Sequence, residues 1–267
     1  MRGRTHLLCL VTSFPFIVSA SLPRIPFSGY SGGTVGAGAV VGWERQGIGV
    51  NPAMSDPRSM GVSLAGYSPF GIDGVKIAEA GAARDGARWG TSLTYLGLYD
   101  VEGGSASAWQ LQESVRLGWG MATGLSVKFQ DDESGRGFGG SLGMLWNRFS
   151  FLTLGGLAET SPMPWGTELA AGLGADIGSD IGMDYAWRLC AEGFYSSAQE
   201  PEWRFGAALR LHSLLSIHGG WSPQTQTFAL GIRFGIGGWK GFSALRRHAA
   251  LGTTSIQGLH WRRALPP

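Results

Sequence analysis

The feature that most constrains this chain is a strict alternation of large apolar residues with small or charged ones. From Thr227 to Gly237 every second residue is a large apolar one, and the residues between them are small or charged. Four further stretches repeat the pattern, at 124–130, 168–177, 183–195 and 203–212. A period of two is that of a β-strand, whose side chains point alternately to opposite faces. The chain therefore predicts a sheet with one apolar face.

Turn-forming residues separate the alternating stretches, for example at 131–135, 161–164 and 222–224. Between Ser59 and Arg263 this spacing gives roughly fourteen strands of about ten residues, the length that crosses a bilayer at the tilt of a barrel strand. After residue 20 no apolar run is long enough for a membrane-spanning helix. The pattern predicts an all-β fold, an antiparallel transmembrane β-barrel over residues 59–263 with a short tail at 264–267.

The composition of the two faces separates a membrane barrel from a soluble β-sheet protein, which is the alternative fold. The face opposite the apolar one carries mainly Gly, Ala and Ser with isolated charges, and the chain has 45 Gly and only 15% charged residues. Small residues suit the inward face of a narrow barrel. Trp and Tyr also gather near the ends of the stretches, where an aromatic girdle would meet the lipid headgroups. Both observations favour the barrel.

The N-terminus has the layout of a secretory signal peptide. Arg2 and Arg4 precede an apolar stretch from Leu7 to Ala20 that ends on small residues, which predicts cleavage after Ala20. Without residues 1–20 the formal charge of +2 falls to zero. A neutral chain without clustered Lys and Arg gives no reason to expect a nucleic-acid partner. The expected location is the bacterial outer membrane, with its lipid bilayer as the first partner.

Two motifs lie near opposite ends of the chain. A small-residue stretch from Gly33 to Val41 leads to the motif Asn51, Pro52 and Ala53. The second motif joins the last two expected strands and contains His248, Leu251, Gly252 and Thr253. Both resemble motifs of the FadL and PorV/PorQ group of outer-membrane proteins, the second as the closing hairpin of the barrel.

The resemblance implies a fourteen-stranded barrel whose N-terminal segment, residues 21–58, includes a hatch inside the lumen. Inward arginines such as Arg204, Arg210 and Arg233 are the expected hydrogen-bond donors to the backbone carbonyls of this hatch. The chain departs from the group in two ways. It is shorter than typical members, so its loops must be short, and Ala264 to Pro267 follows the last strand where many outer-membrane proteins end on an aromatic residue.

The charged residues of interest are those that the alternation points inward. A charge on the lipid face is costly, by about 2 to 4 kcal/mol for Arg at the bilayer midplane, so charge in the strands belongs in the lumen. Either a structural network or a selectivity ring would use such groups. The expected lumenal charged residues are Arg88, Arg116, Lys128, Arg188, Glu192, Arg204, Arg210 and Arg233.

Specific signs of catalysis, metal binding or cofactor binding are few. The histidines after residue 20 lack the spacing of a metal site, and no phosphate-binding loop appears, so no metal or cofactor is expected. His212 next to Ser213, and Ser216 near His218, would suit a barrel-wall lipid esterase. Because no acid is implied to orient either histidine, the chain is not expected to be an enzyme.

Two functions follow from the resemblance. A PorV-like barrel would be a scaffold or docking partner in protein secretion or surface attachment, with secretion-system proteins as partners. A FadL-like barrel would transport a small hydrophobic ligand through a hatch-gated lumen. Short loops leave little room to capture a ligand, which favours the scaffold.

Overall fold

A computed structural model describes residues 37–41, 50–54, 58–72, 74–99, 105–132, 135–163, 166–181, 185–197 and 200–266. The described residues contain fourteen strands, which form one closed antiparallel barrel, and a single 3-10 turn, η1 (Pro69–Gly71). None of the helices found in these residues has the length and apolar character needed to span a membrane. The expected signal peptide, residues 1–20, lies outside the described part of the chain.

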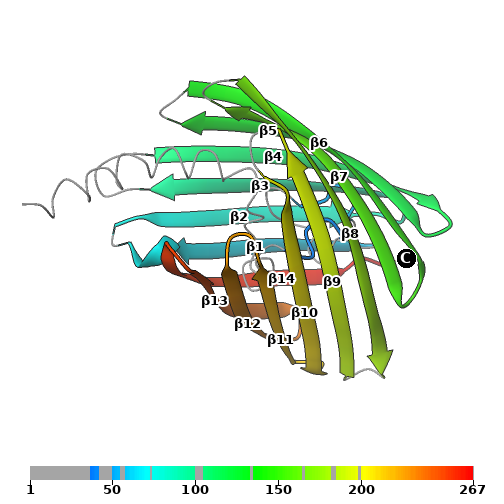
Figure 1. The fold of residues 1–267 in the computed structure, drawn as a ribbon. Coiled ribbons are helices and arrows are strands. Elements are labelled where there is room, and N and C mark those ends of the chain that lie inside the picture. Colours follow the sequence, from blue (N-terminus) through cyan, green and yellow to red (C-terminus); the bar gives the residue numbers. More distant parts are fainter. Residues whose placement is uncertain are drawn as a thin grey trace, which may run out of the picture.

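Each strand pairs with its neighbours in the sequence, and the last pairs with the first, so the sheet has no free edge (Figure 1). Ser59 to Ser68 of the first strand align with Ala264 to Ser255 of the last without a break in register. The fourteen-stranded antiparallel barrel predicted from the sequence is confirmed. The strands are β1 (Ser59–Ser68), β2 (Lys76–Asp85), β3 (Trp89–Tyr99), β4 (Ser105–Gly118), β5 (Met121–Asp132), β6 (Gly135–Phe149), β7 (Leu152–Met163), β8 (Gly166–Ile181), β9 (Tyr185–Ser196), β10 (Glu202–His212), β11 (Leu215–Ser222), β12 (Thr227–Ile236), β13 (Trp239–His248) and β14 (Gly252–Ala264).

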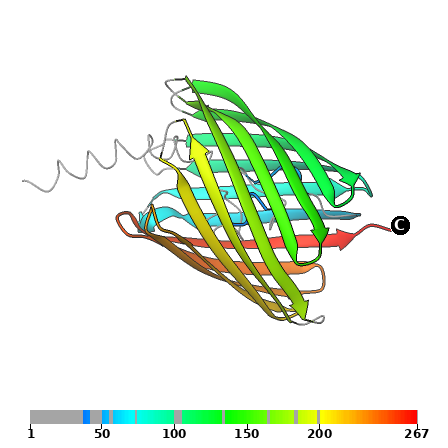
Figure 2. The ribbon, with the colours of Figure 1, turned by 45° about the vertical axis from the view of Figure 1, so that its right-hand side comes forward.

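The two ends of the barrel differ in their connections. We call the end where β1 begins and β14 finishes the proximal end, and the other the distal end; the C-terminus marks the proximal end in Figures 1 and 2. Proximal turns are tight, as at 119–120, 150–151, 213–214 and 237–238. The longest distal connection runs from residue 69 to residue 75. The distal connections are therefore short, as the chain length predicted.

The outward face of the strands is apolar, and the inward face is largely polar or small. On β12, Leu230 is 64% exposed to solvent while its neighbour Ala229 is 8% exposed. Polar side chains on the inward face are buried, among them Gln110, Gln112 and Ser126. A closed sheet that shows large apolar side chains all round its outer surface needs an apolar surrounding, which a bilayer provides.

Large aromatic residues lie close to both rims of this outer surface. Trp89, Trp119 and Trp239 are exposed at or beside proximal strand ends, and Trp203 and Trp221 are exposed near distal ones. An indole ring has an apolar body and a polar N–H group, so it suits the boundary between lipid tails and headgroups. The two belts delimit the part of the barrel that the hydrocarbon layer would surround.

The face assignment on β12 predicts opposite outcomes for neighbouring substitutions. Leu230→Arg would place a guanidinium among lipid tails and should lower the free energy of unfolding by about 2 to 4 kcal/mol. Ala229→Ser adds a hydroxyl to the polar lumen wall and should change it by less than about 0.5 kcal/mol. Denaturant titration of the protein in lipid vesicles, followed by tryptophan fluorescence, measures both. Equal losses would contradict the assignment.

Candidate functional site

Two described stretches of the N-terminal segment, residues 37–41 and 50–54, lie inside the barrel; together we call them the lumenal segment (Figure 2). Val40, Val50 and Asn51 are almost completely buried. The two stretches are joined, because the Asn51 N–H group donates to the Ala39 carbonyl at 2.9 Å. The rest of the segment expected at 21–58 is described only at Arg58.

The lumenal segment rests on a trough of glycines in the barrel wall. Their missing side chains would point inward from four adjacent strands, β5 to β8, and would occupy the space that the segment fills. A Cβ atom at Gly155 would collide with the Val40 carbonyl, and one at Gly124 with the backbone of Pro52 and Ala53. The glycines of this trough are Gly124, Gly143, Gly155, Gly172 and Gly174.

The Asn51-Pro52-Ala53 motif forms a tight turn. The Asn51 side-chain oxygen accepts the Ala53 N–H at 3.0 Å, and the Met54 N–H donates to the Asn51 carbonyl at 3.1 Å. Asn favours such a turn because its side chain bonds to the backbone two residues on, and Pro at the second position fixes φ. The motif therefore gives the segment a rigid corner.

The same Asn51 side chain ties the corner to the wall. Its amide nitrogen lies 2.7 Å from the Val40 carbonyl oxygen and 3.0 Å from each of the carbonyl oxygens of Met144 on β6 and Gly156 on β7. The Gln112 amide donates to the Pro52 carbonyl at 3.2 Å. A buried amide that loses such partners costs about 1 to 3 kcal/mol.

A second anchor is the carboxylate of Glu192 on β9. Its Oε1 atom accepts the Val40 N–H at 2.8 Å and the Val41 N–H at 3.0 Å. Glu192 is fully buried. Adjacent N–H groups directed at a carboxylate form charge-assisted hydrogen bonds, the stronger kind. Here the N–H groups of the described segment donate to an acidic side chain of the wall. This anchoring differs from the arginine-to-carbonyl hydrogen bonds expected from the sequence.

The thiol of Cys190 lies under the lumenal segment. It forms a small apolar cluster with Ala37 and Val41 and is itself buried. Because Ala37 and Val41 pack against it, movement of the segment would expose this sulfur to a soluble thiol reagent. Cys190 is therefore a natural reporter of the position of the segment.

Most of the other residues expected in the lumen lie on inward strand positions. Lys128 is buried on β5, and the Arg116 guanidinium donates to the Ala87 carbonyl at 3.2 Å. Arg188 forms an ion pair of 2.6 Å with the buried carboxylate of Asp176. Arg88 is a correction: it lies in the proximal turn between β2 and β3, outside the strands, so alternation does not place it in the lumen.

Two residues on this list lie on β10. Arg204 is buried, pairs with Glu202 at 2.7 Å and has its guanidinium carbon 4.2 Å from the centre of the Phe194 ring. Arg210 is partly buried near the proximal end, where it lines a cavity together with Arg233 of β12. These charged residues therefore fall at different heights in the barrel and do not form one ring.

The closing hairpin is built around His248, the last residue of β13. Its Nδ1 atom accepts the N–H groups of Ala250 at 3.1 Å and Leu251 at 3.2 Å. Gly252 follows with a φ of +99°, which favours glycine, and Thr253 continues the strand. The motif therefore has a structural explanation as a turn.

In the proximal turn after β10 a histidine ring nitrogen again accepts a backbone N–H group. The Leu214 N–H donates to His212 Nδ1 at 3.2 Å, and the Ser213 hydroxyl lies 3.3 Å from the same nitrogen. This arrangement accounts for the adjacent His and Ser as turn residues.

Sequence reasoning missed an apolar cluster in the distal half of the lumen. Its members point inward from β1, β2, β3, β4, β13 and β14, where a small or charged face was expected. The sequence signal was that apolar residues occupy both faces of β3 between Leu93 and Leu98. The cluster consists of Tyr67, Ile77, Leu96, Ala108, Phe242, Ala244 and Ile256.

The glycine trough predicts that a side chain added at one position will dislodge the lumenal segment, whereas the same side chain at the next position will not. Gly155→Val would strike the Val40 carbonyl, whereas Gly156→Val faces outward, with Leu173 at an ordinary contact distance of 3.6 Å. In a Cys9→Ser background the Cys190 thiol of Gly155→Val should react with a soluble maleimide at least about tenfold faster than that of Gly156→Val, as a 1.4 kcal/mol change in opening would give. Mass spectrometry follows the labelling. Equal rates would show that the trough does not seat the segment.

Comparison with known proteins supports the fold. No protein-family model and no curated protein sequence matches the chain. Among solved structures it is similar to the CymD monoaromatic hydrocarbon channel, with 11% identity, a TM-score of 0.59 and 92% of this chain and 99% of that chain covered.

Two further structures have similar scores. A FadL homologue from Pseudomonas aeruginosa has 8% identity and a TM-score of 0.57, with 90% of this chain and 99% of that chain covered. The outer-membrane protein Omp33 from Acinetobacter baumannii has 10% identity and a TM-score of 0.56, with 77% of this chain and 99% of that chain covered. Identities this low establish the fold alone, and the chain has the fold of the bacterial outer-membrane β-barrels.

Proposed function

We propose that this protein passes a small hydrophobic molecule through the outer membrane, and that the lumenal segment is the gate. The observation that carries the proposal is the seating of the segment, held by Asn51 and Glu192 over a trough made of glycines. A segment bound through a few local contacts can leave and return. In this proposal the chain has no catalytic role.

The apolar cluster in the distal lumen supports an apolar solute. Ile77, Leu96 and Phe242 give one side of the distal lumen an apolar surface. An apolar surface of this kind lowers the barrier for a hydrocarbon relative to a polar one. The similar structures named as a monoaromatic hydrocarbon channel and as the Ralstonia pickettii toluene transporter TbuX agree with this class of solute.

A PorV-like docking role in protein secretion is the second candidate, and the short distal connections favour it. A scaffold would present a fixed outer rim and would not require the lumenal segment to move. The two functions therefore differ in what happens when the segment is locked in place. In a secreting host a locked scaffold would still support secretion, whereas a locked transporter would not pass its solute.

A disulfide between the segment and the wall tests the transport function. Val41 and Cys190 pack in one cluster, so Val41→Cys in a Cys9→Ser background places a second thiol beside the native one. We expect oxidation to lower the uptake of radiolabelled toluene by cells to the background of cells without the protein. A thiol reductant should restore uptake to the level before oxidation.

The Cys9→Ser protein without Val41→Cys is the matched control, and its uptake should not respond to oxidation. Mass spectrometry of the purified protein verifies the cross-link, with Ala37→Cys as the second position for it. Undiminished toluene uptake through a fully cross-linked barrel would contradict a moving gate. Uptake at background in the reduced protein would contradict transport of this solute.

A further inference from the structure

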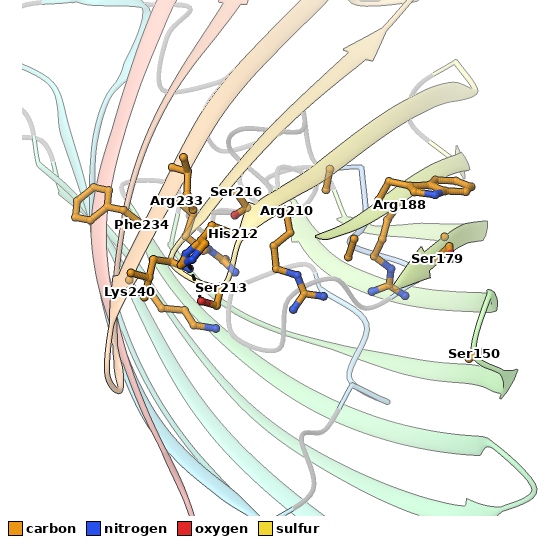
Figure 3. A pocket seen from close by; sticks show the side chains of 17 residues that line it. Ser150, Ser179, Arg188, Arg210, His212, Ser213, Ser216, Arg233, Phe234 and Lys240 are labelled. Carbon is orange, nitrogen blue, oxygen red and sulfur yellow. Dashed lines mark hydrogen bonds between the residues drawn. The ribbon is translucent and has the colours of Figure 1, made fainter. Parts of the chain in front are cut away.

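The proximal end of the lumen contains a cavity that the gate does not use. Its volume is about 400 Å³, and its walls come from the proximal ends of β8 to β13 and from the turns at 150 and 213–214. Figure 3 shows Arg188 and Arg210 reaching into one hollow, with His212, Arg233 and Lys240 grouped on its other side. A cavity of this size is large enough for a small organic molecule.

The described charged side chains that line this cavity are all cations. Among the described residues that line it are four cations, Arg188, Arg210, Arg233 and Lys240, and no carboxylate. Asp176, the ion-pair partner of Arg188, is buried in the adjacent wall and is not part of the lining. The serine hydroxyls of Ser213 and Ser216 add neutral hydrogen-bond donors. Nearly all the polar side chains of the lining can therefore donate hydrogen bonds.

Strand register arranges the four cations as two neighbouring pairs. Arg210 aligns with Ala186 and Arg188 with Ala208, so the two arginines are diagonal neighbours on one face, with Cα atoms about 7 to 8 Å apart. Ser216 aligns with Arg210 on one side and with Arg233 on the other. Lys240 aligns with Gly235, which makes it a diagonal neighbour of Arg233. The cations therefore form an arc from β9 to β13 that is interrupted at β11, where Ser216 lies between Arg210 and Arg233.

Such an arc is complementary to a molecule that carries more than one oxyanion. Long cationic side chains at this spacing can meet on one phosphate or carboxylate group, but the whole arc is too wide for a single group. Low-dielectric walls strengthen each contact relative to open water. The arginines and the lysine also have interactions within the chain, as Arg188 has with Asp176, and a bound anion would add to them.

We propose that the proximal cavity is a binding site for a small polyanion that carries two or more phosphate or carboxylate groups. The site lies beside the entrance to the lumen and is separate from the glycine trough. Binding does not depend on the passage of a hydrocarbon, so the two proposals can fail independently. The chemistry that recognises the ligand is the set of charge-assisted hydrogen bonds from the arc.

Isothermal titration calorimetry of the full chain in a neutral detergent tests the site, with inorganic pyrophosphate and citrate as probes. We expect saturable binding of at least one probe that weakens as salt is added, because the contacts are ionic. The tighter probe identifies the group, phosphate or carboxylate. Absence of saturable binding for both probes at low salt would overturn the proposal.

Three variants locate the binding. Arg210→Gln and Lys240→Gln should each weaken it by about tenfold or more, and Arg210→Lys should weaken it less than Arg210→Gln because the charge remains although the guanidinium geometry is lost. The matched control is Arg136→Gln, which removes an exposed cation of the distal rim that pairs with Asp131. An equal loss in Arg136→Gln would show that the net charge, and not the cavity, attracts the probe.

A fourth variant keeps the proposal testable if removal of a cation impairs folding. Ser216→Asp puts a carboxylate between Arg210 and Arg233, where it would form ion pairs and occupy the place of the ligand. It should abolish binding and leave the thermal unfolding temperature unchanged or higher. Full binding by a folded Ser216→Asp protein would overturn the assignment of the site.

Discussion

Every backbone N–H and C=O group in the strands must find a partner within the protein, because the hydrocarbon layer offers none. Closure of the sheet by β1 and β14 meets this requirement for the wall. The lumenal segment is subject to the same constraint, since it is buried and has no regular strand partner of its own. Its backbone hydrogen bonds with the side chains of Glu192, Gln112 and Asn51 take the place of the strand-to-strand hydrogen bonds that satisfy the wall.

The close contact between the lumenal segment and the wall limits which residues the wall can have there. Backbone can approach a strand closely only where the strand has no side chains, so β5 to β8 have glycine where the segment lies. Among the described residues the opposite wall has no such partner, and it presents Tyr67, Leu96 and Phe242 to the distal lumen instead. One side of the lumen thus binds the lumenal segment, and the other side has an apolar surface formed by its own side chains. A gated path for an apolar solute is consistent with this division.

Alternation is a local property, and for that reason the barrel, its strand number and the faces of strands such as β12 could be predicted from the sequence. Gly174 was also expected to face inward, as a small residue on the inner wall of a narrow barrel, and the structure places it next to Val41 of the lumenal segment. Glu192 was expected in the lumen, yet its partners lie more than 150 residues earlier in the chain. No periodicity encodes such a contact, nor the inward packing of Phe242.

The most direct test of the account is single-channel conductance in planar bilayers after deletion of residues 33–56. We expect the intact barrel to conduct little, since the segment fills the space over the trough. The deletion protein, verified as folded by its heat-modifiable mobility in gels, should then show steady conductance that favours anions, because the cationic arc would line the opened path. A folded deletion protein that conducts no better than the intact one would contradict the claim that this segment closes the lumen.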